Sequence, residues 1–168
     1  LHPVGPRIVG GMIAWPAARA AEVLDLYRKM TVSAPRELTL VLTMRFAPSA
    51  PFVPLEWQGK PIVAIIACHT GPLDQARKDL APLREFGGSI LDAIVEKDYA
   101  EQQRLIDGTQ PNGYHYYWKS EYVSELPDRL LSGFRDQAAR ETSPMCQMVL
   151  FHIGGAIGER PPDDGAVG

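Results

Sequence analysis

The segment from Glu37 to Phe46 alternates between two kinds of side chain, and this alternation limits the possible folds more than any other feature. Every second residue is large and apolar: Leu38, Leu40, Leu42, Met44 and Phe46. Four residues between them share the opposite side: Thr39, Val41, Thr43 and Arg45. Because successive side chains of a strand point to opposite faces, the pattern predicts a β-strand with one face in the core. The semi-polar second face is unlike solvated surface and predicts a cover or a ligand.

Further strands and helices follow from the same kind of periodicity. Residues 61–70 (PIVAIIACHT) are apolar on both faces, which is typical of a central strand. Helical spacing begins after Pro16, whose missing N–H costs nothing at a helix start, and ends at Pro35. The other predicted elements are strands at 7–15, 90–95 and 144–153, and helices at 73–86 (interrupted at Pro82), 98–107 and 126–140.

The order of these elements predicts the fold class. The chain opens as strand, helix, strand, strand, helix, which is the split βαβ plan of ferredoxin-like folds. We therefore expect an α+β fold in which an antiparallel sheet has its helices packed on one face. With 168 residues, 45% of them hydrophobic, the chain is long enough for one core and too short for two domains.

Both ends of the sequence predict a piece of a longer protein. The opening LHPVGP lacks methionine and resembles the exit from a preceding element. Residues 158–168 (GERPPDDGAVG) are rich in turn formers and resemble a linker. The expected division is a domain at 1–157 and a linker-like tail at 158–168.

Composition argues against several classes of partner. The net charge is −3, the pI is about 5.8, and no run of lysine or arginine occurs, so neither nucleic acid nor an anionic membrane is an expected partner. No apolar stretch approaches the ~20 residues that span a bilayer, and no export signal is visible, so a soluble, cytoplasmic protein is expected. Cys68 and Cys146 stand alone in apolar runs, and the four histidines are scattered, so neither a disulfide nor a metal site is expected.

Residues 113–122 (GYHYYWKSEY) hold four of the six tyrosines. This density predicts a strand with one face in the core and the other forming a ligand wall; the alternative is that the aromatic side chains only pack across a sheet. On the wall side, Lys119 could pair with a carboxylate, bind an anionic group or extend into solvent. Arg45 could hold an acidic substrate or form a salt bridge to a helix. No phosphate-loop fingerprint and no nucleophile-elbow context is present, so no catalytic residue is predicted.

Six segments, taken together in order, resemble the middle of FAD-linked oxidases of the berberine bridge enzyme-like group. The segments are LHPVGP, IAWPAARAAEVLDLYRKM, APFVPLEWQGKPIVAIIACHTG, LAPLREFG, YYWKSEYVSELPD and FHIGGAIGERPPD. The resemblance implies that this chain is the substrate-binding domain, an antiparallel sheet backed by helices that covers the flavin ring. It implies Thr43, Arg45, Tyr117 and Lys119 as substrate-binding residues. The glycine-rich flavin-phosphate loops, the flavin-linking histidine and the C-terminal segment of that group are absent from this sequence.

The resemblance therefore implies an enzyme whose FAD-binding domain lies elsewhere in the same polypeptide. That enzyme would oxidise a small organic substrate by hydride transfer to the flavin, and the 168-residue fragment alone would be inactive. The alternative is a free-standing ferredoxin-like binding or oligomerisation domain without catalytic activity. Such a domain would use the same open face for a partner subunit, for example in a homo-oligomer.

Overall fold

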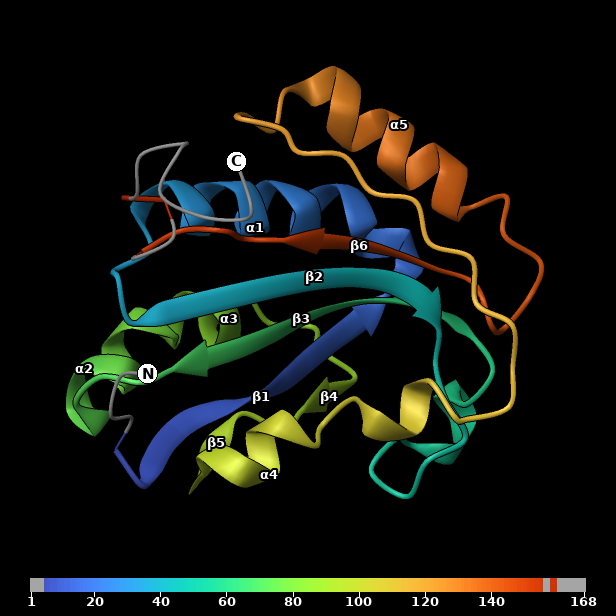
Figure 1. Cartoon of the computed structure of the whole chain (residues 1–168). Coiled ribbons are helices and arrows are strands. Elements are labelled where there is room, and N and C mark those ends of the chain that lie inside the picture. The colour runs from blue at the N-terminus through green and yellow to red at the C-terminus, as the bar shows by residue number, and fades with distance from the viewer. Residues whose placement is uncertain (1–4, 156–157, 160–168) are drawn as a thin grey trace.

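A mainly antiparallel six-stranded sheet forms the centre of the protein in the computed structural model, which describes residues 5–155 and 158–159 (Figure 1). Its strands are β1 (Arg7–Pro16), β2 (Leu38–Phe46), β3 (Pro61–His69), β4 (Leu91–Asp92), β5 (Val95–Asp98) and β6 (Gln147–Phe151). The strand order is β4-β1-β3-β2-β6, and β5 also pairs with β1. β3 is antiparallel to both β1 and β2 and lies between them, which is the split βαβ arrangement. The predicted α+β antiparallel fold is confirmed, as is the central position of residues 61–70.

Four α-helices pack against the leucine side of the sheet. They are α1 (Ala20–Ser33), α2 (Leu73–Asp79), α3 (Ala81–Glu85) and α5 (Asp128–Ala138). Pro16 is followed by a short 3₁₀ turn, η1 (Ala17–Arg19), before α1 begins. The predicted interruption of the second helix is also present: α2 ends three residues before Pro82, and α3 starts one residue before it. In Figure 1, α5 lies beside α1 at the β6 side of the sheet.

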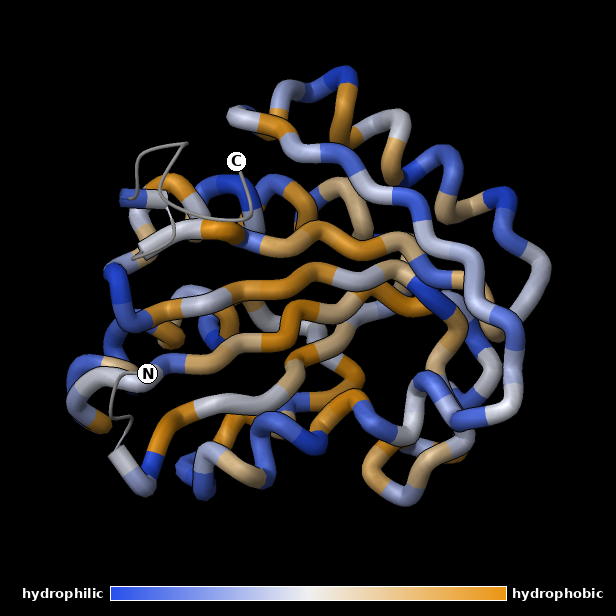
Figure 2. The backbone as a smooth tube through the Cα atoms, viewed as in Figure 1, coloured by the Kyte–Doolittle hydropathy of each residue, from blue (hydrophilic) through white to orange (hydrophobic). Residues whose placement is uncertain are grey.

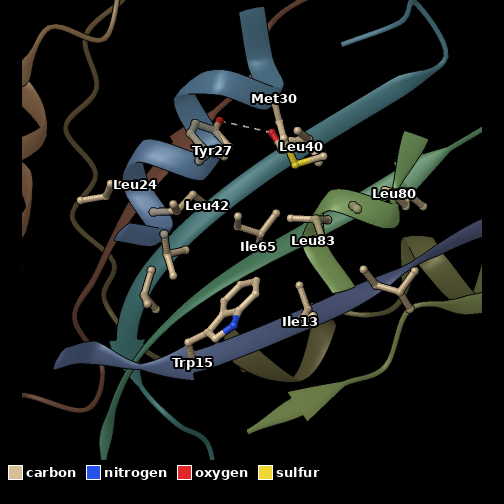
Figure 3. Close-up of a cluster of buried hydrophobic side chains, with 14 of the residues drawn as sticks. Ile13, Trp15, Leu24, Tyr27, Met30, Leu40, Leu42, Ile65, Leu80 and Leu83 are labelled. Carbon is tan, nitrogen blue, oxygen red and sulfur yellow. Dashed lines mark hydrogen bonds between the residues drawn. The ribbon is translucent and has the colours of Figure 1, made fainter. Parts of the chain in front are cut away.

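The core fills the space between these helices and the sheet (Figure 3). Trp15 is completely buried on β1, and its indole N–H donates to the carbonyl of Gly87 at 2.9 Å. Tyr27 of α1 is also buried, and its hydroxyl donates to the carbonyl of Leu150 at 3.0 Å. Burial without a charged partner raises the pKa of the Tyr27 phenol, so the hydroxyl remains a donor at all ordinary pH values. This hydrogen bond attaches the late strand β6 to the first helix.

One helix lies on the opposite face of the sheet. α4 (Tyr99–Gln103) follows β5, and the side-chain amide of Gln102 donates to the carbonyl of Ala67 in β3 at 3.2 Å. Two short 3₁₀ turns, η2 (Leu55–Trp57) and η3 (Asp107–Thr109), complete the helical elements of the described residues. The helix predicted at 98–107 is thus shorter, and the strand predicted at 90–95 is divided into β4 and β5.

The strand predicted at residues 113–122 is wrong. This segment has no regular secondary structure and passes along the end of the sheet on its way to α5 (Figure 1). A strand needs a neighbour for its backbone N–H and C=O groups, and residues 113–122 pair with none of the six strands. The aromatic side chains are consequently exposed rather than packed across a sheet: Tyr114, Tyr116, Tyr117, Trp118 and Tyr122. The predicted tail at 158–168 lies almost wholly outside the described residues.

Candidate functional site

The face of the sheet opposite the main helix layer carries a cavity of about 390 Å³. Its floor follows from strand parity: the side chains of β2 and β3 that point away from the core form it, with help from β1 and β6. These residues are Met12, Thr39, Val41, Thr43, Arg45, Ile62, Ala64, Ile66, Cys68, Gln147, Val149 and Phe151. Figure 2 shows that hydrophobic residues continue along the central strands on which this floor is built. The sheet therefore has the open face predicted from residues 37–46, and this face contains the cavity.

Two connections supply the walls of the cavity. α4 and the residues after it contribute Tyr99, Gln102, Leu105 and Ile106, while the loop after β2 contributes Phe52. Trp118, from the aromatic segment, also lines the cavity although 57% of its surface is exposed. A mostly apolar hollow with a few polar groups and a volume of this size is typical of small-molecule sites.

Two polar atoms at this site are buried without any hydrogen-bond partner among the described residues. They are the hydroxyl oxygen of Thr43 and the side-chain carbonyl oxygen of Gln102, whose residues are 6% and 9% exposed. Both residues line the cavity. An unsatisfied polar atom removed from water costs roughly 1–3 kcal/mol, so a partner from a ligand or from solvent is expected at each.

Arg45 is the one cationic residue among the described residues that line the cavity. It is half-buried, and its Nε and one terminal nitrogen donate to the Phe46 carbonyl at 3.3 Å and to Gln147 Oε1 at 3.2 Å. Burial lowers the pKa of the guanidinium, yet an arginine remains charged at neutral pH. No ion pair between described residues includes Arg45, which disfavours the salt bridge to a helix considered from sequence.

Cys68 also lines the cavity, but it is not a strong nucleophile there. Burial raises the pKa of its thiol, and the positive charge of Lys97 opposes this shift more weakly. The thiol is therefore protonated at neutral pH, and the thiolate is the reactive form of cysteine. Cys68 behaves as a small apolar part of the floor.

The four residues implied as substrate-binding fall into two groups. Thr43 and Arg45 lie two residues apart on β2 and both line the cavity. Tyr117 is 90% exposed, Lys119 is exposed as well, and neither is among the lining residues. The alternation of side chains along a strand does not apply to Tyr117 and Lys119, because their segment is not a strand. Their neighbour Trp118 lines the cavity instead. Gln102 was missed because its proximity to β3 depends on how the chain returns over the sheet after β5.

Within residues 5–155 and 158–159, no three or more His, Cys, Asp or Glu side chains are grouped so that they could hold a metal ion. None of the helices described is both long and apolar enough to cross a lipid bilayer.

No protein-family model and no curated protein matches this chain. Among solved structures, it is similar to 6-hydroxy-D-nicotine oxidase from Arthrobacter nicotinovorans, with 20% sequence identity and a TM-score of 0.47. The match covers 66% of this chain and 23% of the oxidase. The chain thus spans about a quarter of the length of that protein.

Replacing Thr43 by valine should raise the free energy of unfolding of the ligand-free chain by about 1 kcal/mol. The substitution keeps the shape of the side chain and removes a buried hydroxyl oxygen that has no partner among the described residues. Thr39→Val is the matched control, because Thr39 lines the same cavity but is exposed, and it should change the value by less than about 0.5 kcal/mol. Urea unfolding of both variants makes the comparison. A loss of stability in Thr43→Val but not in Thr39→Val would show that the Thr43 hydroxyl already has a hydrogen-bond partner, for example a bound water.

Proposed function

We propose that this chain is the substrate-binding domain of an FAD-dependent oxidoreductase of the berberine bridge enzyme-like group. In this proposal the cavity on the open face holds a small organic substrate, and an FAD-binding domain of the same polypeptide covers that face. The observation that carries the proposal is the cavity itself, whose apolar floor holds a partnerless Thr43 hydroxyl and a half-buried Arg45. The proposed cofactor and reaction rest on the resemblance to this group, which is carried by the ordered series of segments from IAWPAARAAEVLDLYRKM to FHIGGAIGERPPD.

The residues of this chain fit the part of such an active site that binds the substrate, and they do not form a complete site for the cofactor. The cavity has room for a small substrate, but the described residues contain no glycine-rich loop of the kind that cradles the phosphates of FAD. FAD would therefore be held by the other domain, where it would accept hydride from the substrate. The role of this chain would be to bind and orient the substrate and to exclude water. Arg45, Gln147 and Thr43 are among the polar lining groups available for orientation, and the aliphatic side chains of β2 and β3 exclude water.

The aromatic segment supports a covering partner. Tyr114, Tyr117, Trp118 and Tyr122 are exposed on one connection beside the cavity, and large exposed aromatic side chains gathered in one place mark interaction surfaces. The same observation favours the second candidate, a free-standing binding or oligomerisation domain. In that case a second copy of the chain, not a flavin domain, would cover the open face.

Purification of the full-length polypeptide that carries this chain distinguishes the two candidates. We expect flavin absorption that is bleached under anaerobic conditions by a suitable substrate, because hydride transfer reduces the flavin. Analytical ultracentrifugation of the same sample gives its oligomeric state. A flavin-free, stable dimer would contradict the oxidoreductase proposal and support the oligomerisation domain.

A further inference from the structure

We propose that the cavity binds a small molecule with an apolar body and one carboxylate group, and that Arg45 and Gln147 hold the carboxylate. This inference names the substrate class of the site and therefore rests on the function proposed above. It follows from the unequal distribution of polar groups along the cavity floor.

The cationic end of the floor is formed by two residues that are partners across the sheet. Arg45 of β2 is directly opposite Gln147 of β6, and their side chains are joined by the 3.2 Å hydrogen bond. A guanidinium has five N–H donors, of which protein groups occupy two here, so three remain for a ligand. The amide nitrogen of Gln147 adds a further donor, because its oxygen is the atom that accepts from Arg45. A planar carboxylate matches this group of donors.

The floor is mainly apolar away from Arg45, although Thr43 and Thr39 also belong to it. Thr43 is flanked by Ala64 on one side and Val149 on the other, and Val41 is flanked by Ile66 and Phe151. A strand advances about 3.3 Å per residue, so the four residue steps from Arg45 to Val41 provide roughly 13 Å of floor. A ligand that lies along β2 would place its charged group at Arg45, pass the Thr43 hydroxyl, and rest its apolar body on Val41.

The charge of the site favours a carboxylate over a phosphate. Arg45 is the one cation among the described lining residues, and no carboxylate side chain lines the cavity among those residues to neutralise it. One guanidinium balances the single charge of a carboxylate, whereas a phosphate monoester carries nearly two charges at neutral pH. Enclosure by Ile62 and other apolar lining residues strengthens the pairing, because desolvated charges are screened less than exposed ones.

The test is calorimetric titration of the full-length polypeptide with two probes of the same shape, 2-naphthylacetate and its neutral amide, 2-naphthylacetamide. We expect the carboxylate to bind at least about tenfold more tightly, as expected for charge-assisted hydrogen bonds. Arg45→Gln should reduce this preference to within about twofold, and Arg45→Lys should retain part of it because the charge remains. Arg129→Gln is the matched control, since Arg129 is exposed on α5 on the opposite face, and it should preserve the preference. Circular dichroism checks that each variant is folded.

Equal binding of the two probes, binding of neither, or a preference that survives in Arg45→Gln would each overturn the inference. Should Arg45→Gln fail to fold, the probe pair on the unaltered protein and the Arg45→Lys variant still decide the question. Flavin absorption measured on the same samples separates this result from the proposed function. A carboxylate preference in a flavin-free protein would sustain the inference and reject the oxidoreductase. Bound flavin without a carboxylate preference would reject the inference alone.

Discussion

Replacement of Trp15 by alanine should lower the free energy of unfolding by about 3–5 kcal/mol. Trp15 is completely buried on β1, its indole N–H donates to the Gly87 carbonyl, and its ring meets Phe86 edge-on with centroids 5.7 Å apart. Alanine would remove the ring contacts and leave both a cavity and an acceptor with one donor fewer. Urea unfolding followed by far-ultraviolet circular dichroism is the suitable measurement, because tryptophan fluorescence changes with the substitution itself.

Two variants serve as controls for the Trp15 result. Trp118→Ala makes the same change at a side chain that is 57% exposed, and we expect a loss below about 1 kcal/mol. Trp15→Phe keeps an aromatic ring but removes the N–H donor, so its loss should be intermediate. Equal losses for Trp15→Ala and Trp118→Ala would contradict the burial of Trp15 within the core cluster drawn in Figure 3.

Replacement of Gly11 by alanine should lower the free energy of unfolding by at least about 3 kcal/mol. Gly11 has φ of 145°, a region that other residues rarely adopt, and a Cβ placed on it would overlap the carbonyl of Ala93. Ala93 belongs to the connection between β4 and β5, and its N–H donates to the Met12 carbonyl at 2.8 Å. A side chain at Gly11 would therefore force this connection away from β1. The change is measured by urea unfolding and by hydrogen exchange of the β4 and β5 amides.

Gly133→Ala is the matched control for Gly11. Gly133 lies inside α5, is exposed, and has no atom within 4 Å of an added Cβ. Alanine in a helix interior stabilises by roughly 0.5–1 kcal/mol relative to glycine, so this variant should gain stability. Losses of equal size at both glycines would show that the close approach of Ala93 to β1 does not occur.

The elements that the sequence predicted well are those whose pattern is long and regular. Residues 38–46 alternate over nine positions, and residues 61–69 are apolar on both faces, so both strands, and the central position of the second, followed from their patterns. The same reasoning placed Thr43 and Arg45 on the open face, where the cavity is found. Strand parity is a local property of the backbone, and for this reason it needs no knowledge of distant contacts.

The aromatic segment shows where this reasoning fails. Its residues are good strand formers, but a strand also needs a partner strand, and residues 113–122 pair with none of the six strands of the sheet. The exposure of Tyr117 and Lys119 and the position of Trp118 at the cavity follow from this lack of strand pairing. No property of residues 113–122 alone reports whether another strand pairs with them.

The sequence by itself determined that one side of β2 is core and that the other side is chemically unusual, because side chains alternate across any strand whatever surrounds it. Only the tertiary structure decided that this unusual side is a cavity. Its walls come from α4, the loop after β2 and Trp118, and the hydrogen-bond partner of Arg45 lies 102 positions away at Gln147. Contacts over such separations are set by how the strands pair and how the connections cross the sheet, and no local pattern encodes them.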